Sequence, residues 1–388
     1  KCLRQMAHIQ YPEGPLPPWG PYRGCGRFYP PWSAFWGLAL LDHYDLTAER
    51  DVLEELWPNL RKLLEWTIEQ SDNEVGLIGS PSPGWFKQRR REDPWRAWME
   101  AEKTQYLVWH NAPFAPLLRR AAKAARVLGR EEEAERYRAA GEDFAAAMHD
   151  ALLNEETGRC GDYDPQTGRT DGGQSRSGMV LWSGALDAGA ATKAVETLFD
   201  RERSGIGAPF HGLLLVEGLY RYGRSQEALD FMRRYWGEML RRGATTFWDN
   251  FSLDWRDGKV AGRNTSLCHG WAAGPTYSLG AHVLGVRPQA PGFAEIRIEP
   301  EPGDLEWAAG TVPAPHGDVE VRWTRAADIF RIEASIPEGC TASVALPPLP
   351  TRADKVKVDG VPTEAQVQGP KLVVQVPAGD HEIVRSPR

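Results

Sequence analysis

The strongest chemical signal in the sequence is a carboxylate that directly follows two aromatic residues, at Phe247-Trp248-Asp249. Aromatic neighbours reduce the hydration of a carboxylate and raise its basicity. A carboxylate of this kind is a candidate general base, the group that takes a proton from an attacking water molecule. An isolated Asp is more often a helix cap or a surface residue, so the role of Asp249 depends on the pattern around it.

A second segment brings an imidazole and an indole together, because His269 and Trp271 lie at one predicted helix start. A sugar hydroxyl can bond an imidazole nitrogen while the apolar face of the sugar stacks on an indole ring. The alternative is a core histidine bonded to the backbone. No HxxH or HExxH spacing surrounds His269, so the sequence predicts neither a metal site nor a cofactor here.

Tryptophan is frequent, with 16 residues in a chain of 388. This content accompanies stacking on sugars or aromatic ligands, although large cores also use it. Several tryptophans lie in or beside long segments rich in Gly and Pro, and such segments often carry binding residues. We predict that the following tryptophans contribute to one substrate pocket: Trp36, Trp85, Trp95, Trp98, Trp248 and Trp271. The insertion 93–100 also holds carboxylates, one of which is a weak candidate for a substitute general acid.

Repeated helices must position these segments. Apolar residues recur every three or four positions over 53–68, 131–152 and 209–222, which predicts helices with one apolar face. Short turns such as Leu128-Gly129-Arg130 separate neighbouring stripes. The first three quarters of the chain are therefore predicted to be helical hairpins in series.

Near Pro288 the period changes from 3.6 to 2. Val319, Val321 and Trp323 alternate with charged residues, and further short alternating runs are separated by turn residues. This punctuation predicts roughly six to eight short strands in a β-sandwich. We therefore expect two domains, a helical domain at residues 1–287 and a β-sandwich at residues 288–388.

Helical hairpins followed by a β-sandwich resemble the (α/α)6-barrel glycoside hydrolases, and three segments are more specific. Residues 243–249 (GATTFWD) are similar to the GATTxWE segment of the family 78 α-L-rhamnosidases. Residues 266–275 (SLCHGWAAGP) resemble the SxCHGWSAGP helix start of that family, and 307–313 (WAAGTVP) resemble its junction between barrel and sandwich. The resemblance implies a mainly α fold with a β appendage: an (α/α)6 toroid, complete or incomplete, followed by an antiparallel β-sandwich.

The resemblance also implies an activity. Enzymes of this bacterial family release terminal α-L-rhamnose with inversion, using two carboxyl groups, so the expected partner is a rhamnose-containing oligosaccharide or glycoside. Asp249 takes the position of the family's Glu general base, with a side chain one methylene shorter, and His269 takes that of a sugar-binding His. The family's acidic motif, which carries the general acid, is not found in this chain.

The number of helices offers a reason for the missing acid. A closed barrel of this kind needs about twelve helices, and the stripes in this sequence number about ten. We expect that about two N-terminal helices, including the one that bears the acid, are missing from the sequence. The sequence does not begin with Met, which fits this expectation.

Two other functions fit the same residues. One is a related (α/α)6 hydrolase that acts on another sugar, since Asp in place of Glu could accompany a changed specificity. The other is a non-catalytic carbohydrate-binding homologue that keeps the tryptophan pocket and lacks the acid.

Composition excludes other classes. A net charge of −7 disfavours general binding to nucleic acid. No run of 18 apolar residues predicts a membrane span, and the sequence start has no signal-peptide core, which predicts a cytoplasmic protein. The five cysteines are scattered, which predicts free thiols in a reducing compartment rather than a disulfide framework: Cys2, Cys25, Cys160, Cys268 and Cys340.

Overall fold

A computed structural model describes most of the chain, and it divides the chain into two compact units. The described residues are 1–18, 20, 28–81, 102–199, 205–253, 266–326, 328–349 and 355–387. The helical unit consists of Lys1–Asp42, Arg50–Gly223 and Glu238–Cys268. The sandwich unit consists of His43–Glu49, Arg224–Gly237 and His269–Arg388.

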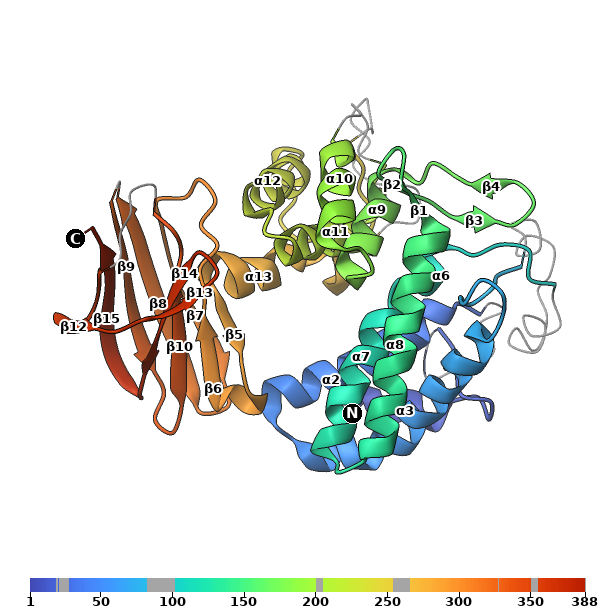
Figure 1. Cartoon of the computed structure of the whole chain (residues 1–388), viewed down its shortest axis with the longest axis horizontal. Coiled ribbons are helices and arrows are strands. Elements are labelled where there is room, and N and C mark those ends of the chain that lie inside the picture. The colour runs from blue at the N-terminus through green and yellow to red at the C-terminus, as the bar shows by residue number, and fades with distance from the viewer. Residues whose placement is uncertain are drawn as a thin grey trace. The chain divides into compact units, whose positions relative to one another are not determined.

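Helices dominate the chain up to residue 241 (Figure 1). They are α1 (Cys2–His8), α2 (Pro30–Thr47), α3 (Arg50–Ser71), α6 (Val108–Asn111), α7 (Phe114–Val127), α8 (Glu131–Leu152), α9 (Gly173–Ser183), α10 (Ala188–Leu198), α11 (Pro209–Arg221) and α12 (Ser225–Arg241). Two antiparallel two-stranded sheets join α8 to α9, formed by β1 (Leu153–Asn154) with β2 (Arg159–Cys160) and by β3 (Tyr163–Asp164) with β4 (Gly168–Arg169).

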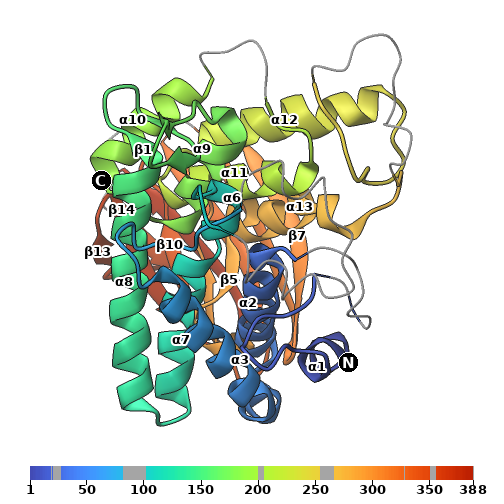
Figure 2. The same cartoon turned by 90° about the vertical axis from the view of Figure 1, so that its right-hand side faces the viewer.

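The pair α7 and α8 shows how the sequence sets a hairpin (Figure 2). Gly129 adopts a left-handed φ of 71°, which an L side chain rarely adopts, and ends α7. The Arg130 amide then bonds the Ala125 carbonyl at 2.9 Å. Glu131 and the next two glutamates begin α8, where negative charge complements the helix dipole. The predicted turn and the predicted bounds of α8 are confirmed.

Helices α9 and α11 approach each other closely because both carry glycine at the contact. A Cβ added at Gly178 would lie 2.8 Å from the Cβ of Leu215, and one added at Gly218 would lie 2.8 Å from the Cβ of Leu181. Any larger residue would push the helices apart. The close packing fixes the side chains that these two helices present to the candidate site.

The last helical segment is short and irregular. It consists of the 3-10 turn η1 (Gly270–Ala272), the helix α13 (Gly274–Ser278) and the π-helical turn η2 (Leu279–Leu284). Pro275 at the start of α13 fits the first turn of a helix, where no amide donor is needed. Gly285, with a φ of 88°, ends the segment.

Two sheets follow in the sandwich unit (Figure 1). The strands are β5 (Val286–Pro288), β6 (Glu295–Ile298), β7 (Trp307–Ala314), β8 (Gly317–Ala326), β9 (Ile329–Ile336), β10 (Thr341–Leu346), β11 (Lys355–Val358), β12 (Val361–Thr363), β13 (Gln366–Gln368), β14 (Lys371–Val376) and β15 (Gly379–Ser386), with the 3-10 turn η3 (Pro291–Phe293) before β6. One sheet has the order β13-β14-β10-β6-β5, and the other has the order β12-β11-β15-β9-β8-β7.

The strand pairs are antiparallel except for one. Strands β6 and β10 run parallel, with Ile296 opposite Ala342 and Ile298 opposite Val344. The predicted fold class, helical hairpins followed by an antiparallel sandwich, is confirmed. The predicted six to eight strands were too few, because short strands such as β5, β12 and β13 carry little alternation.

Alternating residues form the core of the six-stranded sheet. Val319, Val321 and Trp323 are buried while their neighbours along β8 are mostly exposed. Trp323 is fully buried, stacks on Phe330 at a centroid distance of 5.4 Å and donates its indole N–H to the Val283 carbonyl at 2.8 Å. Burial of this ring with its polar atom satisfied is a strong stabilising feature of the unit.

Charged residues on the five-stranded sheet form a network, which we call the Glu299 network. The Glu299 carboxylate accepts hydrogen bonds from Arg287 at 2.7 Å, Arg297 at 3.1 Å and Lys371 at 2.7 Å. Burial alone would raise the pKa of Glu299, but the bonds from Arg297 and Lys371 outweigh it and lower the pKa to about 2. Ser225, at the start of α12, donates to the neighbouring Glu301 at 2.9 Å.

The structure also bears on the cysteines and on membrane insertion. Cys2, Cys160, Cys268 and Cys340 are free thiols, and Cys25 lies outside the described residues. Within the described ranges, no helix has both the length and the apolar character that crossing a membrane requires.

Candidate functional site

The loop that carries Asp249 starts at the end of α12. Gly243, with a φ of 88°, turns the chain, and its amide bonds the Leu240 carbonyl at 2.9 Å. The Thr246 hydroxyl donates to the Leu267 carbonyl, and the Asp249 amide donates to the Ser266 carbonyl at 2.9 Å. These two bonds join the two motif segments that the sequence singled out, 243–249 and 266–268, within the helical unit.

Aromatic residues on both sides of Asp249 pack against each other. Trp248 is only 3% exposed and packs on the fully buried Phe251, with ring centroids 6.0 Å apart. Asp249 itself is half-buried, and the side-chain amide of Asn250 donates from Nδ2 to Oδ2 of Asp249 at 3.1 Å. The backbone on both sides of Asp249 is thus held by buried aromatic side chains, which would suit a positioned proton acceptor.

A second group of rings lies in the same unit, and we call it the aromatic cluster. Its members are all half-buried and come from four helices: Trp32 and Phe35 of α2, Trp109 of α6, Trp182 of α9, and Phe210 and His211 of α11.

The cluster is tightly connected. Phe35 stacks on Trp182 with centroids 5.9 Å apart and meets Phe210 edge-on at 5.1 Å. Trp109 lies 5.9 Å from Trp32 and 5.1 Å from His211. Half-buried aromatic rings that pack against one another are typical of surfaces that bind a ligand with both apolar and hydroxyl groups.

His211 brings a polar group to this cluster. Its Nδ1 lies 3.1 Å from the Ser175 hydroxyl. Burial, together with the smaller effect of the positive charge of Arg176, lowers the pKa of His211 to about 4. At neutral pH the imidazole is therefore uncharged and offers hydrogen bonds rather than a charge to a ligand.

A second histidine, which is buried, lies beside the aromatic cluster. His110, next to Trp109 on α6, is 2% exposed, and its Nδ1 lies 2.5 Å from the Ser80 hydroxyl. Burial lowers its pKa to about 4, although the carboxylate of Asp162 acts against this shift. Asp162 also accepts the Val108 amide at 2.9 Å, so it fixes the start of α6.

The Asp249 loop and the aromatic cluster are joined through one backbone contact. The Phe251 amide donates to the Gly207 carbonyl at 3.2 Å. Gly207 lies two residues before Pro209, where α11 starts, and three residues before Phe210. The candidate base and the start of α11, which carries Phe210 and His211, are therefore parts of one local structure in the helical unit.

His269 and Trp271 belong to the sandwich unit, at the start of η1. Their ring centroids are 4.7 Å apart with an interplanar angle of 30°. The Trp271 amide donates to His269 Nδ1 at 3.3 Å, so the neutral imidazole carries its proton on Nε2. The His269 residue is exposed, unlike a core histidine.

The remaining predicted site residues fall into two groups. Trp36 is 6% exposed and donates its indole N–H to the Leu3 carbonyl at 3.1 Å, so it offers little surface to a ligand. Trp248 is buried as well. Trp85, Trp95 and Trp98 lie outside the described residues.

The sequence did not single out Phe35, Phe210 or His211 as site residues. The only signal was the position of Phe210 and His211 directly after Pro209, at the first turn of a helix that follows a glycine-rich segment. Among the described residues, no group of three or more His, Cys, Asp or Glu side chains is placed to hold a metal ion.

Comparisons with known proteins match both parts of the chain. Residues 1–283 match the bacterial alpha-L-rhamnosidase 6 hairpin glycosidase domain, and residues 285–360 match the bacterial alpha-L-rhamnosidase C-terminal domain. An alpha-L-rhamnosidase of Alteromonas sp. is 26% identical over 331 residues, which cover 81% of this chain and 35% of that protein.

Solved structures give the same fold. An alpha-L-rhamnosidase from Dictyoglumus thermophilum superimposes with a TM-score of 0.74 at 19% identity, over 99% of this chain and 43% of that one. A Streptomyces avermitilis alpha-L-rhamnosidase complexed with L-rhamnose gives a TM-score of 0.72 at 19% identity, over 98% of this chain and 36% of that one. The chain thus spans about a third of the length of the Alteromonas relative and less than half of these two structures.

Proposed function

This chain belongs to the bacterial α-L-rhamnosidase six-hairpin glycosidase family, and we propose that it is part of a glycoside hydrolase that releases terminal α-L-rhamnose. The expected substrate is a rhamnose-containing oligosaccharide or glycoside. The single observation that carries the proposal is the contact of the Asp249 loop with Gly207, two residues before α11, the helix that supplies Phe210 and His211 to the aromatic cluster.

The chemistry asks for a carboxylate beside a sugar-sized apolar surface. In an inverting mechanism, Asp249 takes a proton from a water molecule, and the water oxygen attacks the anomeric carbon from the side opposite the leaving oxygen. A second carboxyl group gives its proton to the leaving oxygen as the glycosidic bond breaks. We assign Asp249 as the base and assign the acid to no residue of this chain.

We assign substrate binding to two sets of residues. Rings of the aromatic cluster pack against the apolar face and the C6 methyl group of rhamnose. His269 donates its Nε2 proton to a sugar oxygen beside Trp271, as its tautomer allows. The cytoplasmic location and the domain division at residues 287 and 288 stay predictions of the sequence.

The proposal is tested with the full-length gene product and an aryl α-L-rhamnoside. Asp249→Asn keeps the side-chain shape and removes the proton acceptor, so kcat should fall by about 10²–10⁴ while rhamnose binding persists. Proton NMR of the first product formed should show inverted anomeric configuration. His269→Ala should instead raise KM with little change in kcat, because it removes a binding contact and leaves the base in place.

Asp143→Asn is the matched control, since Asp143 is exposed on α8. Near wild-type kcat in Asp249→Asn would show that another residue is the base. Rhamnose binding without turnover in the wild type would identify a carbohydrate-binding homologue, and turnover of other glycosides alone would identify a hydrolase for another sugar.

A further inference from the structure

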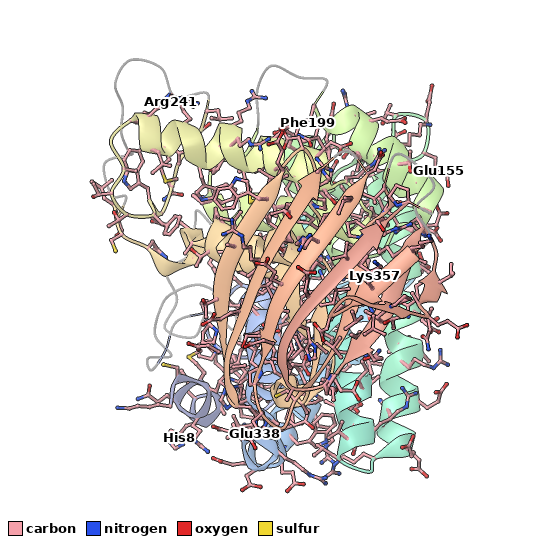
Figure 3. The ribbon with its side chains drawn as sticks, turned by 90° about the vertical axis from the view of Figure 1, so that its left-hand side faces the viewer. His8, Glu155, Phe199, Arg241, Glu338 and Lys357 are labelled. Carbon is pink, nitrogen blue, oxygen red and sulfur yellow. The ribbon has the colours of Figure 1, made fainter. Side chains whose placement is uncertain are left out.

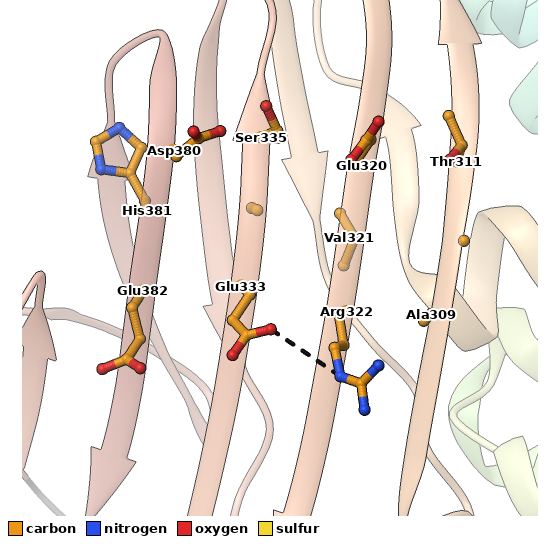
Figure 4. Close-up of a pocket in the computed structure, with 12 residues that line it drawn as sticks. Ala309, Thr311, Glu320, Val321, Arg322, Glu333, Ser335, Asp380, His381 and Glu382 are labelled. Atoms are coloured by element: carbon orange, nitrogen blue, oxygen red, sulfur yellow. Dashed lines mark ion pairs between the residues drawn. The ribbon is translucent and has the colours of Figure 1, made fainter.

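The outer face of the six-stranded sheet carries a groove of about 630 Å³ (Figure 4). Two ladders of paired residues cross strands β7, β8, β9 and β15 and form its floor. One ladder is Thr311, Glu320, Ser335 and Asp380, and the other is Ala309, Arg322, Glu333 and Glu382. Four strands span about 14 Å at the usual strand spacing, which is long enough for a short oligosaccharide.

An exposed indole borders the groove. Trp307 belongs to the next ladder, opposite Thr324, and is 60% exposed. The Arg322 guanidinium lies 6.0 Å from the centre of its ring. Figure 3 shows this face of the sheet toward the viewer, with Lys357 of β11 on it. A large apolar ring is normally buried. An indole that is exposed on a strand face therefore indicates a ligand that covers it.

Two of the four carboxylates that line the groove are paired with arginines. Arg322 lies 4.0 Å from Glu333, and Arg331 is paired with Glu382. Both nitrogens of His381 are engaged as well, by Asp359 at 2.9 Å and by the Pro377 carbonyl at 3.1 Å. The groove therefore offers hydrogen-bond acceptors, a guanidinium donor and hydroxyls rather than a strong field of one sign.

We propose that Trp307 and this groove form a second carbohydrate-binding site, which holds the internal, neutral residues of the polymer whose end the helical unit acts on. The indole stacks on a sugar ring, and Arg322, Glu333 and Ser335 bond its hydroxyls. Among the described residues, no ion pair engages Glu320 or Asp380, and these two carboxylates repel anionic sugars, so the ligand is uncharged. The identity of the polymer rests on the proposed function, whereas the site itself does not.

The test uses the full-length protein and retardation in gels that contain a neutral α-L-rhamnan, with free L-rhamnose added to occupy the catalytic site. Wild type should be retarded, and Trp307→Ala should bind about tenfold more weakly because a stacking anchor is lost. Trp307→Phe should restore part of the binding. Val367→Ala, at a 75% exposed position on β13 of the other sheet, is the control and should bind as wild type.

Turnover separates this site from the catalytic one. Trp307→Ala should keep wild-type kcat and KM on an aryl rhamnoside, which has no internal sugar residue for the groove to hold, and should show a raised KM on the rhamnan. If the wild type does not turn over the aryl rhamnoside but its retardation depends on Trp307, the proposed function is wrong and the groove proposal is supported.

Three results would overturn the groove as a sugar site. They are equal retardation of wild type and Trp307→Ala, no retardation of wild type, and binding of a lysine-rich peptide that salt abolishes while the rhamnan does not bind. The last result would show a cationic partner, because only charge pairing is strongly screened by salt.

Discussion

Trp323 of the sandwich unit and Trp109 of the helical unit both pack against other aromatic rings, yet their surroundings differ. Trp323 is fully buried, stacks on Phe330 and has its indole nitrogen bonded to the backbone. Trp109 is half-buried among rings that are half-buried too, beside an uncharged histidine. The first arrangement maximises apolar burial, and the second leaves its rings only half-buried.

The same contrast extends to the charged groups. The sandwich unit keeps Glu299 ionised by surrounding it with cations, whereas the helical unit keeps His110 and His211 neutral by burial. Aromatic rings and titratable groups thus serve stability in one unit and a candidate binding surface in the other. Three measurements test this difference.

The largest effect is expected from Trp323→Ala. Removal of a fully buried indole leaves a cavity and should lower the free energy of unfolding by about 3–5 kcal/mol. Urea denaturation followed by amide hydrogen exchange, read separately over the sandwich strands, measures the loss. Trp307→Ala on the same sheet is the matched control and should cost less than about 0.5 kcal/mol, because surface substitutions rarely cost more. Equal losses in both variants would contradict the contrast between buried and exposed rings.

The second effect is a difference in acid sensitivity. The pKa of His110 is about 4 in the fold and 6.5 ordinarily, so the unfolded chain binds a proton between these values that the fold does not. Stability of the helical unit should therefore fall as pH drops from 6.5 to 4, by on the order of 3 kcal/mol for His110.

For Glu299 the folded pKa of about 2 lies below its ordinary 4.5, so its stabilisation is complete above pH 4.5 and is lost between 4.5 and 2. Amide exchange from pH 7 to 3 should show the helical unit opening first. His110→Gln should flatten the helical profile and leave the sandwich profile unchanged. Opening of the sandwich unit at the higher pH would reverse the comparison.

The smallest effect concerns the aromatic cluster. Trp109→Ala should weaken binding of L-rhamnose about tenfold, as expected for the loss of one stacking surface, with a modest loss of stability. Trp36→Phe, at a buried position on α2, should change stability and leave the rhamnose dissociation constant as in wild type. Isothermal titration measures both constants. A larger loss of affinity in Trp36→Phe would make Trp36 the binding residue, as the sequence predicted.

The sequence predicted elements well where the hydrophobic pattern was clean. Helix α8 follows its apolar stripe to both ends, and β8 follows the alternation of Val319, Val321 and Trp323. Strand β10 was missed because it is buried on both sides from Ala342 to Leu346, which removes the alternation. Strand β7 was missed because Gly310 and Pro313 interrupt it.

The site was harder to predict for a related reason. Helix α2 is apolar on nearly all sides over 30–41, so the sequence could not tell that Trp32 and Phe35 face the cluster while Trp36 enters the core. Asp249 could be singled out as a candidate because a local motif surrounds it. Phe210 and His211 gain their importance only through long-range contacts with α2 and α6, which no local pattern encodes.

The parallel pairing of β6 with β10 has a consequence for how the protein is made. Strand β6 leaves the ribosome 46 residues before its partner, because Glu295 lies opposite Thr341. At translation rates of about 5–20 residues per second, one edge of β6 waits for several seconds. Strand β5 can cover the other edge at once, since the two form an antiparallel pair. The waiting edge is a site where nascent chains can associate, and a fragment that stops before residue 341 should aggregate during synthesis.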